Sequence, residues 1–419
     1  MGVRERFGER RGSAHGSVRR CFLTRNALEF AAYRSVITDL VETQYIALGV
    51  GLAVSLVCSL LLVATTRWHG RFTLDATRGI QKFHSVPTPR IGGLAIMLGL
   101  IFACAVSSPP QQDLLAPLLA AAAPAFLFGI AEDMTRRISI GARLAATMAS
   151  GLACWALTGA SIVATGISFV DAALAWLPLS VLFTAFAVGG LANAVNIIDG
   201  FNGLASGTVI IGLLALGFIA LDCGDVELAQ ICFTVCAVTA GFFLVNFPFG
   251  KLFLGDGGAY LLGFLLAWLA VTLVHRNPDV SPWAPLLACA YPIFETVFTI
   301  VRRLWCRRHP GRPDSCHLHS LVKIAIAGRY FRKFSSPLRN ALVSPFSWFL
   351  AAVPALLAVN APRDSSALTQ ATLASFGLYL ALYWYVASAS RARRRRATRP
   401  PARNASLAST DAETASLQA

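Results

Sequence analysis

Hydrophobic runs of about 20 residues alternate with short polar segments along most of this 419-residue chain. A run of that length matches a helix that crosses the hydrocarbon core of a bilayer. The pattern predicts an all-α polytopic membrane protein with about eleven transmembrane helices, and ten is the main competing count. The expected spans cover residues 44–65, 92–107, 114–131, 143–165, 173–192, 203–221, 229–248, 257–275, 283–301, 340–359 and 367–388.

Composition supports this interpretation and divides the chain into three parts. Hydrophobic residues make up 56% and charged residues only 14%, whereas soluble domains are about one quarter charged. Residues 44–390 are expected to form one multi-span domain. Residues 1–43 carry eight Arg and no apolar period, which indicates a basic extension that is disordered or results from a misassigned start. Residues 391–419 are expected to form a disordered, Arg-rich tail.

The formal net charge of +15 is distributed unevenly over the loops. Loops that follow odd-numbered spans, together with the tail, hold nearly all Lys and Arg of the domain, and the opposite loops hold only Arg276 and Arg363. The positive-inside rule therefore places the basic loops in the cytoplasm. In this orientation the arginines of residues 1–43 would lie outside the cell, against the rule. This favours the interpretation of residues 1–43 as an extension. The tail cluster is chemically able to bind anionic headgroups or nucleic acid, but a stop signal directly after a span explains it better, so no nucleic-acid partner is expected.

Polar clusters occur in five of these basic-side loops, and the opposite loops carry no comparable group. Groups must share a face before they can converge on one site, so the distribution predicts a single site at one membrane surface. The clusters are QKFHSVPTPRIGG (81–93), AEDMTRRISIGAR (131–143), NAVNIIDGFNG (193–203), FPFGKLFLGDGG (247–258) and RRHPGRPDSCHLHSL (307–321).

Asn193, Asn196 and Asp199 follow one another at intervals of three, so a last helical turn projects them in one direction. Amide and carboxylate oxygens are hard donors that suit Mg²⁺. A helix end with turn residues explains the Asn-Gly pairs, but three polar side chains at membrane depth are costly without a function. A functional interpretation is therefore favoured for this cluster.

Carboxylates also mark two other clusters. Asp256 lies among glycines at the start of a span, where it is equally suited to bind a metal or to cap the helix. Glu132 and Asp133 are adjacent, which suits a proton acceptor or a cation partner. The structural alternative for this pair is an ion pair with Arg136 or Arg137.

Histidines and basic residues complete the candidate chemistry. His317 and His319 suit hydrogen bonds to a pyrophosphate, since the spacing of nearby Cys and His matches no standard zinc site. Lys82, His84 and Arg90 supply positive charge for an anion, although topology alone also accounts for basic residues in this loop. Glu295, inside a span, is expected to snorkel or to pair with Arg302 or Arg303, and no chemistry is assigned to it.

With these clusters, residues 45–390 resemble the polyprenyl-phosphate N-acetylhexosamine-1-phosphate transferases, the WecA-type enzymes, whose superfamily includes the phospho-MurNAc-pentapeptide transferase. The family pattern N-x-x-N-x-x-D-G-x-x-G-L-A spans Asn193 to Ala205 in full. The other elements are G-D-x-G at Gly255–Gly258, N-x-P-x-x-K from Asn246 to Lys251, K-x-H at Lys82 and His84, and D-x-x-H-x-H from Asp314 to His319. Two departures are Glu132 in place of Asp, and Ser320 in place of a third His.

The resemblance implies transfer of a sugar-1-phosphate, such as GlcNAc-1-phosphate, from a UDP-amino sugar to undecaprenyl phosphate at the cytoplasmic face of the bacterial inner membrane. It implies Mg²⁺, with Mn²⁺ as the alternative ion, held by Asn196 and Asp256 with Asp199 close by. Asp133, with Glu132, is expected to act on the lipid phosphate. Lys82 and His84 are expected to hold that phosphate, and His317 and His319 the pyrophosphate. Asn193, Asn202, Asn246 and Phe253 are expected at the nucleotide sugar.

Two other functions remain as alternatives. The nearer one is the pentapeptide-sugar transferase of the same superfamily. The other is a secondary transporter, a class that often carries internal repeats and midplane binding groups. No repeat is evident, and the polar groups lie at span ends. The sequence leaves open the sugar, the glycan pathway and the oligomeric state, for which a homodimer is one alternative.

Overall fold

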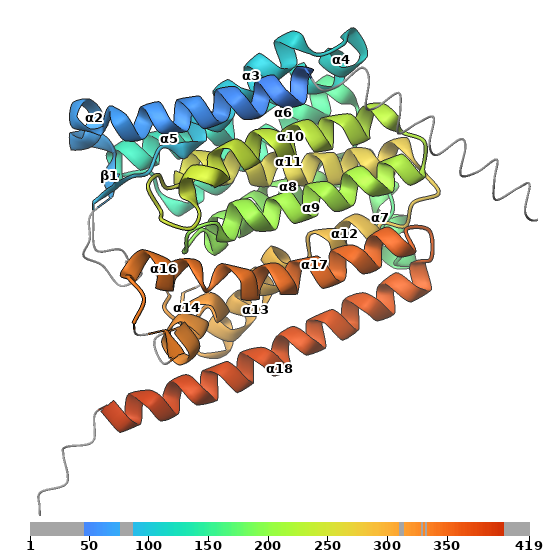
Figure 1. Ribbon diagram of the computed structural model, residues 1–419. Coiled ribbons are helices and arrows are strands. Elements are labelled where there is room, and N and C mark those ends of the chain that lie inside the picture. The colour runs from blue at the N-terminus through green and yellow to red at the C-terminus, as the bar shows by residue number, and fades with distance from the viewer. Residues whose placement is uncertain (1–45, 76–86, 310–313, 328–329, 332, 398–419) are drawn as a thin grey trace, which may run out of the picture.

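A computed structural model describes residues 46–75, 87–309, 314–327, 330–331 and 333–397, and shows a bundle of long helices that run along a common direction (Figure 1). The first helix is Ile46–Ala64. The elements after it are α2 (Thr66–Thr73), β1 (Leu74–Asp75), β2 (Thr88–Pro89), α3 (Gly92–Val106), α4 (Pro109–Ala121), α5 (Ala123–Thr135), α6 (Ile140–Thr158), α7 (Ser168–Leu174), α8 (Leu177–Ile198), α9 (Leu204–Asp222), α10 (Val226–Asn246), α11 (Gly255–Arg276), α12 (Trp283–Ala288), α13 (Ala290–Trp305), α14 (Leu318–Val322), η1 (Lys323–Ala327), α16 (Ser336–Ala341), α17 (Ser344–Asn360) and α18 (Ser365–Ala397).

The prediction of an all-α, multi-pass membrane protein is confirmed. Within the described ranges, eight helices are long and apolar enough to span a bilayer, and the bent pair of α4 and α5 makes nine. The count of eleven is not confirmed. The second expected span is α3, which has only 15 residues, and the ninth is broken at Cys289 into α12 and α13.

The bend between α4 and α5 measures 45° and has a local cause. Pro124 occupies the first turn of α5, where it has no N–H to continue the hydrogen-bond ladder of α4. The break directs α5 so that its last turn, with Glu132 and Asp133, ends beside the first turn of α11.

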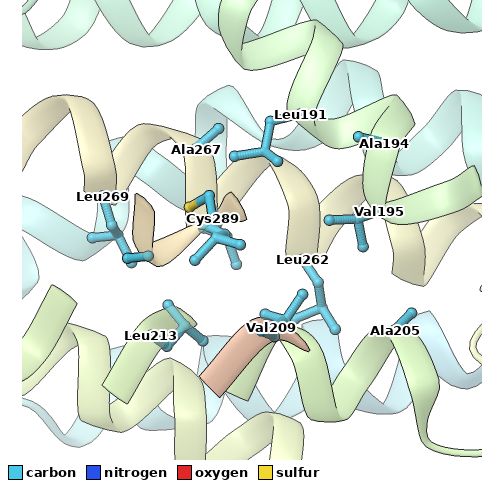
Figure 2. Close-up of a cluster of buried hydrophobic side chains, with 14 of the residues drawn as sticks. Leu191, Ala194, Val195, Ala205, Val209, Leu213, Leu262, Ala267, Leu269 and Cys289 are labelled. Carbon is cyan, nitrogen blue, oxygen red and sulfur yellow. The ribbon is translucent and has the colours of Figure 1, made fainter. Parts of the chain in front are cut away.

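Helix α11 lies at the centre of the bundle, between α8, α5, α3 and α9. In α11, 78% of the apolar stretch is buried inside the protein. In helix Ile46–Ala64, at the periphery, the corresponding share is 22%. A helix that is apolar on all sides is stable in a protein core or in lipid, and α11 takes the first of these positions. Side chains of α8, α9 and α11, among them Val195, Val209 and Leu262, meet in its core (Figure 2).

An antiparallel sheet of two strands, each of two residues, closes one end of the bundle. Leu74 of β1 pairs with Pro89 of β2. The backbone N–H of Phe253 donates to the carbonyl of Pro89 at 2.8 Å, which ties this sheet to the segment before α11. The first polar cluster is thereby joined to the fourth.

The described segments of the five polar clusters lie at this same end, together with β1, α14 and α16 (Figure 1). The opposite end holds exposed ion pairs, such as Arg276 with Asp225 at 2.7 Å. Helix α18 continues to Ala397, past the boundary expected at residue 390. Residues 1–45 and 398–419, which include the predicted extension and most of the predicted tail, lie outside the described residues.

Candidate active site

A cavity of about 510 Å³ opens among the loops at the end of the bundle that carries the polar clusters. Its walls come from segments that are far apart in the sequence. Ten of the residues singled out from the sequence line it: Glu132, Asn193, Asn196, Asp199, Asn202, Asn246, Phe253, Asp256, His317 and His319. The expected convergence of the clusters is therefore observed, while the role of each residue at a substrate stays a prediction.

Asp256 stands in the first turn of α11 but does not cap it. Its carboxylate instead accepts hydrogen bonds from Arg90 Nη2 at 2.9 Å and Arg143 Nη1 at 2.6 Å. The cap comes from Asp133 of α5, whose Oδ1 and Oδ2 accept from the backbone N–H groups of Asp256 and Gly257 at 2.8 and 3.0 Å. Carboxylate charge at a helix N-terminus is favourable, because the first N–H groups are unpaired and the helix dipole is positive there.

Glycine is required where α5 and α11 meet. Gly255 has a φ of +75°, and a Cβ on it would lie 2.3 Å from the carbonyl oxygen of Arg90 and 2.6 Å from Asp133 Oδ2. Likewise, a Cβ on Gly129 would lie 2.5 Å from the Cα of Gly257. The close approach of the two backbones brings the Asp133 carboxylate within reach of the α11 amides.

Arg90 links the carboxylates on this side of the cavity. Its Nε lies 3.1 Å from Asp133 Oδ1, and its Nη1 lies 3.7 Å from Asp75. Arg143 of α6 adds a second cation, 3.7 Å from Glu132 Oε1. The expected alternative, in which Arg136 or Arg137 pairs with Glu132 or Asp133, is wrong. Arg136 adopts a left-handed conformation at the end of α5 and donates to the carbonyl of Leu74 instead.

The expected terminal turn of α8 is present. Asn193 and Asn196 lie in its last two turns, Asp199 is the C-cap residue, and all three line the cavity. Asn193 is fixed by donation to Thr147 Oγ1 and to the carbonyl of Gly189. Burial raises the pKa of the Asp199 carboxyl to about 7, and the nearby Asp256 carboxylate adds to the shift.

Asn196, Asp199 and Asp256 fit a hard divalent cation in their donor chemistry, since all three offer oxygen atoms to one cavity. Among the described residues, the side chains of Asn196 and Asp199 have no hydrogen-bond partner, which leaves their oxygens available. Asp256 is bound by Arg90 and Arg143, so an ion there would compete with a guanidinium. The described part of the chain has no cluster of three or more His, Cys, Asp or Glu able to hold an ion, so an amide oxygen would be needed as well.

Asn202, Asn246 and Phe253 lie on the wall between α8 and α11, and their polar groups also bind protein. Asn246 Oδ1 accepts from the N–H of Gly203 at 2.5 Å, and its Nδ2 donates to the carbonyl of Leu252 at 2.7 Å. Asn202 Nδ2 donates to the carbonyl of Pro248 at 2.8 Å. These bonds join two loops of the wall, and contact with a nucleotide stays a prediction.

His317 and His319 also line the cavity, with their rings stacked, 5.2 Å between centroids. Both are buried. Burial lowers the pKa of His319 to about 4, so this ring is neutral near pH 7 and donates through only one nitrogen. Its ring also makes an edge contact with Phe201 at 5.7 Å.

The expected pairing of Glu295 with Arg302 or Arg303 is wrong. Both arginines pair with Asp314 instead. Glu295 is fully buried, and its Oε1 lies 3.0 Å from His317 Nδ1. A charge inside a span was a sequence signal for a functional group, but its partner could not be identified without the fold.

Two expected site residues, Lys82 and His84, lie outside the described residues. Sequence reasoning also assigned no role to Arg143, which ends the second polar cluster and proves to bind Asp256. No motif includes this arginine, and its separation from Glu132 in the sequence does not indicate a contact. The two residues meet only because α6 turns back along α5. Tyr379 of α18, which contacts Glu295, carried no sequence signal at all.

Comparison with known proteins covers several of these site residues. The sequence model of glycosyl transferase family 4 matches residues 115–274. The probable undecaprenyl-phosphate N-acetylglucosaminyl 1-phosphate transferase of Bacillus subtilis is 30% identical over 57% of this chain and 66% of its own length. The chain belongs to glycosyl transferase family 4.

Other relatives in the family carry a similar name. The undecaprenyl-phosphate alpha-N-acetylglucosaminyl 1-phosphate transferases of Yersinia pestis and Escherichia coli K12 are 29% and 26% identical, each over 58% of this chain and 67% of the relative. The chain therefore spans about two thirds of the length of these curated relatives. The family match includes Asp133, Asn196, Asp199 and Asp256, and it ends before His317.

Proposed function

We propose that this membrane protein transfers a sugar-1-phosphate, with GlcNAc-1-phosphate the first candidate, from a UDP-sugar to undecaprenyl phosphate. An oxygen of the lipid phosphate attacks the β-phosphorus of the UDP-sugar. The new P–O bond forms as the bond to the bridging oxygen breaks, and UMP leaves. The names of the relatives support the acceptor and the transferred group.

The observation that carries the proposal is the composition of the cavity. Carboxylates, amide oxygens, three arginines and two histidines line one space at the end of a bundle of membrane-spanning helices. Phosphoryl transfer depends largely on positioning and charge neutralisation, for which such groups are suited. A water-soluble nucleotide and a membrane-bound phosphate meet at a membrane surface, which by the distribution of Lys and Arg would be the cytoplasmic face of the inner membrane.

Asn196, Asp199 and Asp256 would hold Mg²⁺ or Mn²⁺, which when bound would neutralise charge on the diphosphate. Arg90 and Arg143 border the same space and are positioned to bind phosphate oxygens once a ligand competes for Asp256. His317 and His319 line the same cavity and would bind the diphosphate there.

The two adjacent carboxylates have different surroundings, which suggests different tasks. Glu132 lines the cavity and is the one accessible to a lipid phosphate. Asp133 is fully buried and is held by Arg90 and two backbone amides, so in this conformation it positions Asp256. We propose Glu132 as the group that contacts the lipid phosphate and Asp133 as its structural support.

A transporter is the second candidate from the sequence, but the location of the polar groups argues against it. The cavity lies at the helix ends, at the loops after α8 and before α11, whereas transporters bind substrates near the middle of the membrane on broken helices. The pentapeptide-sugar transferase differs only in its donor, so a donor panel separates it from the proposed enzyme.

The test is a transfer assay with the purified full-length chain, undecaprenyl phosphate, Mg²⁺ and radiolabelled UDP-sugars, including UDP-MurNAc-pentapeptide. We expect UMP release and label that extracts with lipid. Asp256→Asn should lower kcat by about 100- to 1,000-fold, because it removes charge from the centre of the site. Glu227→Gln, an exposed site at the opposite end, is the matched control and should leave the rate unchanged.

Soluble label trapped inside proteoliposomes, without lipid-extractable product, would support transport and contradict the proposal. Full turnover by Asp256→Asn, with the protein present in the same amount, would refute its role at the metal.

A further inference from the structure

Glu295 is a fully buried carboxylate on α13 whose partners all donate to it. Tyr379 Oη donates to Oε2 at 3.0 Å, and the backbone N–H of Leu318 lies 3.2 and 3.3 Å from the two oxygens. His317 Nδ1 lies 3.0 Å from Oε1. Hydroxyl and amide donors stabilise the ionised carboxylate, which can only accept hydrogen bonds.

An ionised Glu295 requires the proton of His317 on Nδ1. With Nδ1 committed to Glu295, Nε2 is the ring nitrogen left for a ligand in the cavity that His317 lines. In the neutral ring this Nε2 has a lone pair and no proton. Binding to a phosphate oxygen through Nε2 therefore needs a second proton, and the carboxylate charge behind the ring compensates that positive charge.

Helix α18 contacts Glu295 at one point and the histidine segment itself at two points. Besides the Tyr379 bond to Glu295, Tyr383 Oη donates to the carbonyl of Cys316 at 3.1 Å, and Ser390 Oγ donates to the carbonyl of Leu321 at 3.2 Å. A plain membrane anchor has no need for polar contacts of this kind. The contacts fix the backbone on both sides of His317.

We infer that Glu295 is a positioning residue for His317. It keeps the proton of the neutral imidazole on Nδ1, so that Nε2 accepts a second proton and donates a charge-assisted hydrogen bond to a phosphate oxygen of the nucleotide sugar. The inference rests on the proposed function for the identity of the ligand. It adds a group that does not touch the substrate but sets the charge and orientation of one that does.

The other charged and titratable groups around His317 do not replace Glu295. His319 stacks on the ring and is neutral near pH 7. Asp314 is engaged by Arg302 and Arg303. Tyr379 directs its hydroxyl at Glu295, and Thr299 Oγ1 is a weak contact of Nδ1 at 3.4 Å. Glu295 is thus the one carboxylate at hydrogen-bond distance from this ring among the described residues.

A purely structural role, in which Glu295 only ties α13 to α14 and α18, makes different predictions. Loss of a structural bond would lower the stability or the amount of active protein, but it would leave the pH dependence of the remaining activity unchanged. Loss of a positioning carboxylate changes the proton affinity of His317, so it alters the pH profile.

The test uses Glu295→Gln and Glu295→Asp in the full chain, each alone and with His317→Gln. We expect Glu295→Gln to lower kcat about 10- to 100-fold. The high-pH limb of its kcat/KM profile should move to lower pH by about one unit or more, because the compensating charge is gone. Glu295→Asp should recover part of the loss, and Glu295→Gln should add almost nothing in the His317→Gln background.

A second readout does not depend on activity. In ¹⁵N-histidine-labelled protein without ligand, the His317 ring, assigned with His317→Gln, should carry its proton on Nδ1 and should change toward the Nε2–H tautomer in Glu295→Gln. An unchanged tautomer, an unshifted pH profile or full additivity of the two substitutions would overturn the inference. If no donor is turned over, the proposed function fails, while the tautomer still tests the Glu295–His317 pair.

Discussion

Two sides of the cavity contrast in how their charged groups are held. On the acidic side, formed by Asp133, Asp256, Arg90 and Arg143, two backbone amides hold the Asp133 carboxylate where α5 closely approaches α11. The two arginines hold the Asp256 carboxylate. On the histidine side, formed by Glu295, His317, His319 and Tyr379, one backbone N–H, that of Leu318, donates to Glu295. The other support comes from side chains, and part of it comes from the last helix.

The difference has a physical consequence. A site built on crossing backbones is rigid and tolerates almost no added volume, since packed interiors leave no room for a further methyl group. A site built on a chain of side-chain hydrogen bonds tolerates volume changes better but is sensitive to the loss of one proton or one charge. Substitutions on the two sides should therefore fail in different ways.

The largest effect is expected from Gly255→Ala on the acidic side. The added Cβ meets Arg90 and Asp133 at a positive φ, so we expect a loss of about 2–4 kcal/mol in stability and nearly complete loss of transfer. Thermal unfolding of the detergent-purified protein and the transfer assay measure the two quantities. Gly141→Ala is the control, because a Cβ there has no neighbour within 4 Å. Equal behaviour of the two variants would contradict a backbone-built acidic side.

A smaller effect is expected from Arg143→Gln. The substitution removes a charge-assisted hydrogen bond to Asp256 and a cation at the phosphates, so kcat/KM for the UDP-sugar should fall about 10- to 100-fold with little change in unfolding temperature. Arg137→Gln, at an exposed arginine in the loop before α6, is the control and should match the unmodified protein. An unfolding temperature that drops without a change in kcat/KM would show that Arg143 only stabilises the fold.

The smallest effect is expected from Tyr379→Phe on the histidine side. It removes one hydrogen bond to Glu295, so the rate of transfer should fall about two- to tenfold. The high-pH limb of the kcat/KM profile should shift in the opposite direction to that of Glu295→Gln, or should not shift. The control is Tyr291→Phe, which removes another buried hydroxyl whose partner is Ser347. If both variants lose activity equally, the contact from α18 has no specific part in the site.

Local patterns predicted much of the acidic side and of the cavity wall. The three-residue spacing of Asn193, Asn196 and Asp199 is a property of one helical turn, so it survives in any fold that keeps α8 helical. Glycines around Asp256 likewise marked the start of a helix, and the structure shows that Gly255 and Gly257 lie where the backbones come close together. In both cases the information lies within a few residues of the chain.

The partners of charged side chains were predicted poorly. Arginines nearby in sequence were the alternative partners for Glu132 and one of two expectations for Glu295, yet the observed contacts are Arg143 with Glu132 and His317 with Glu295. A buried charge selects the donor that the packed helices bring near, and the nearest charge in sequence often turns away to satisfy a different acceptor, as Arg136 does with Leu74.

By itself the sequence determined that the chain crosses a membrane many times, and that its polar chemistry gathers in loops at one end. Hydrophobic run length and charge asymmetry depend only on the order of residues, which is why these features could be predicted. Tertiary structure decided that Asp133 caps the helix of Asp256 and that Glu295 and Tyr379 stand behind His317. Those contacts join residues that are far apart along the chain, and helix packing sets which side chains meet, with no signal in the local pattern.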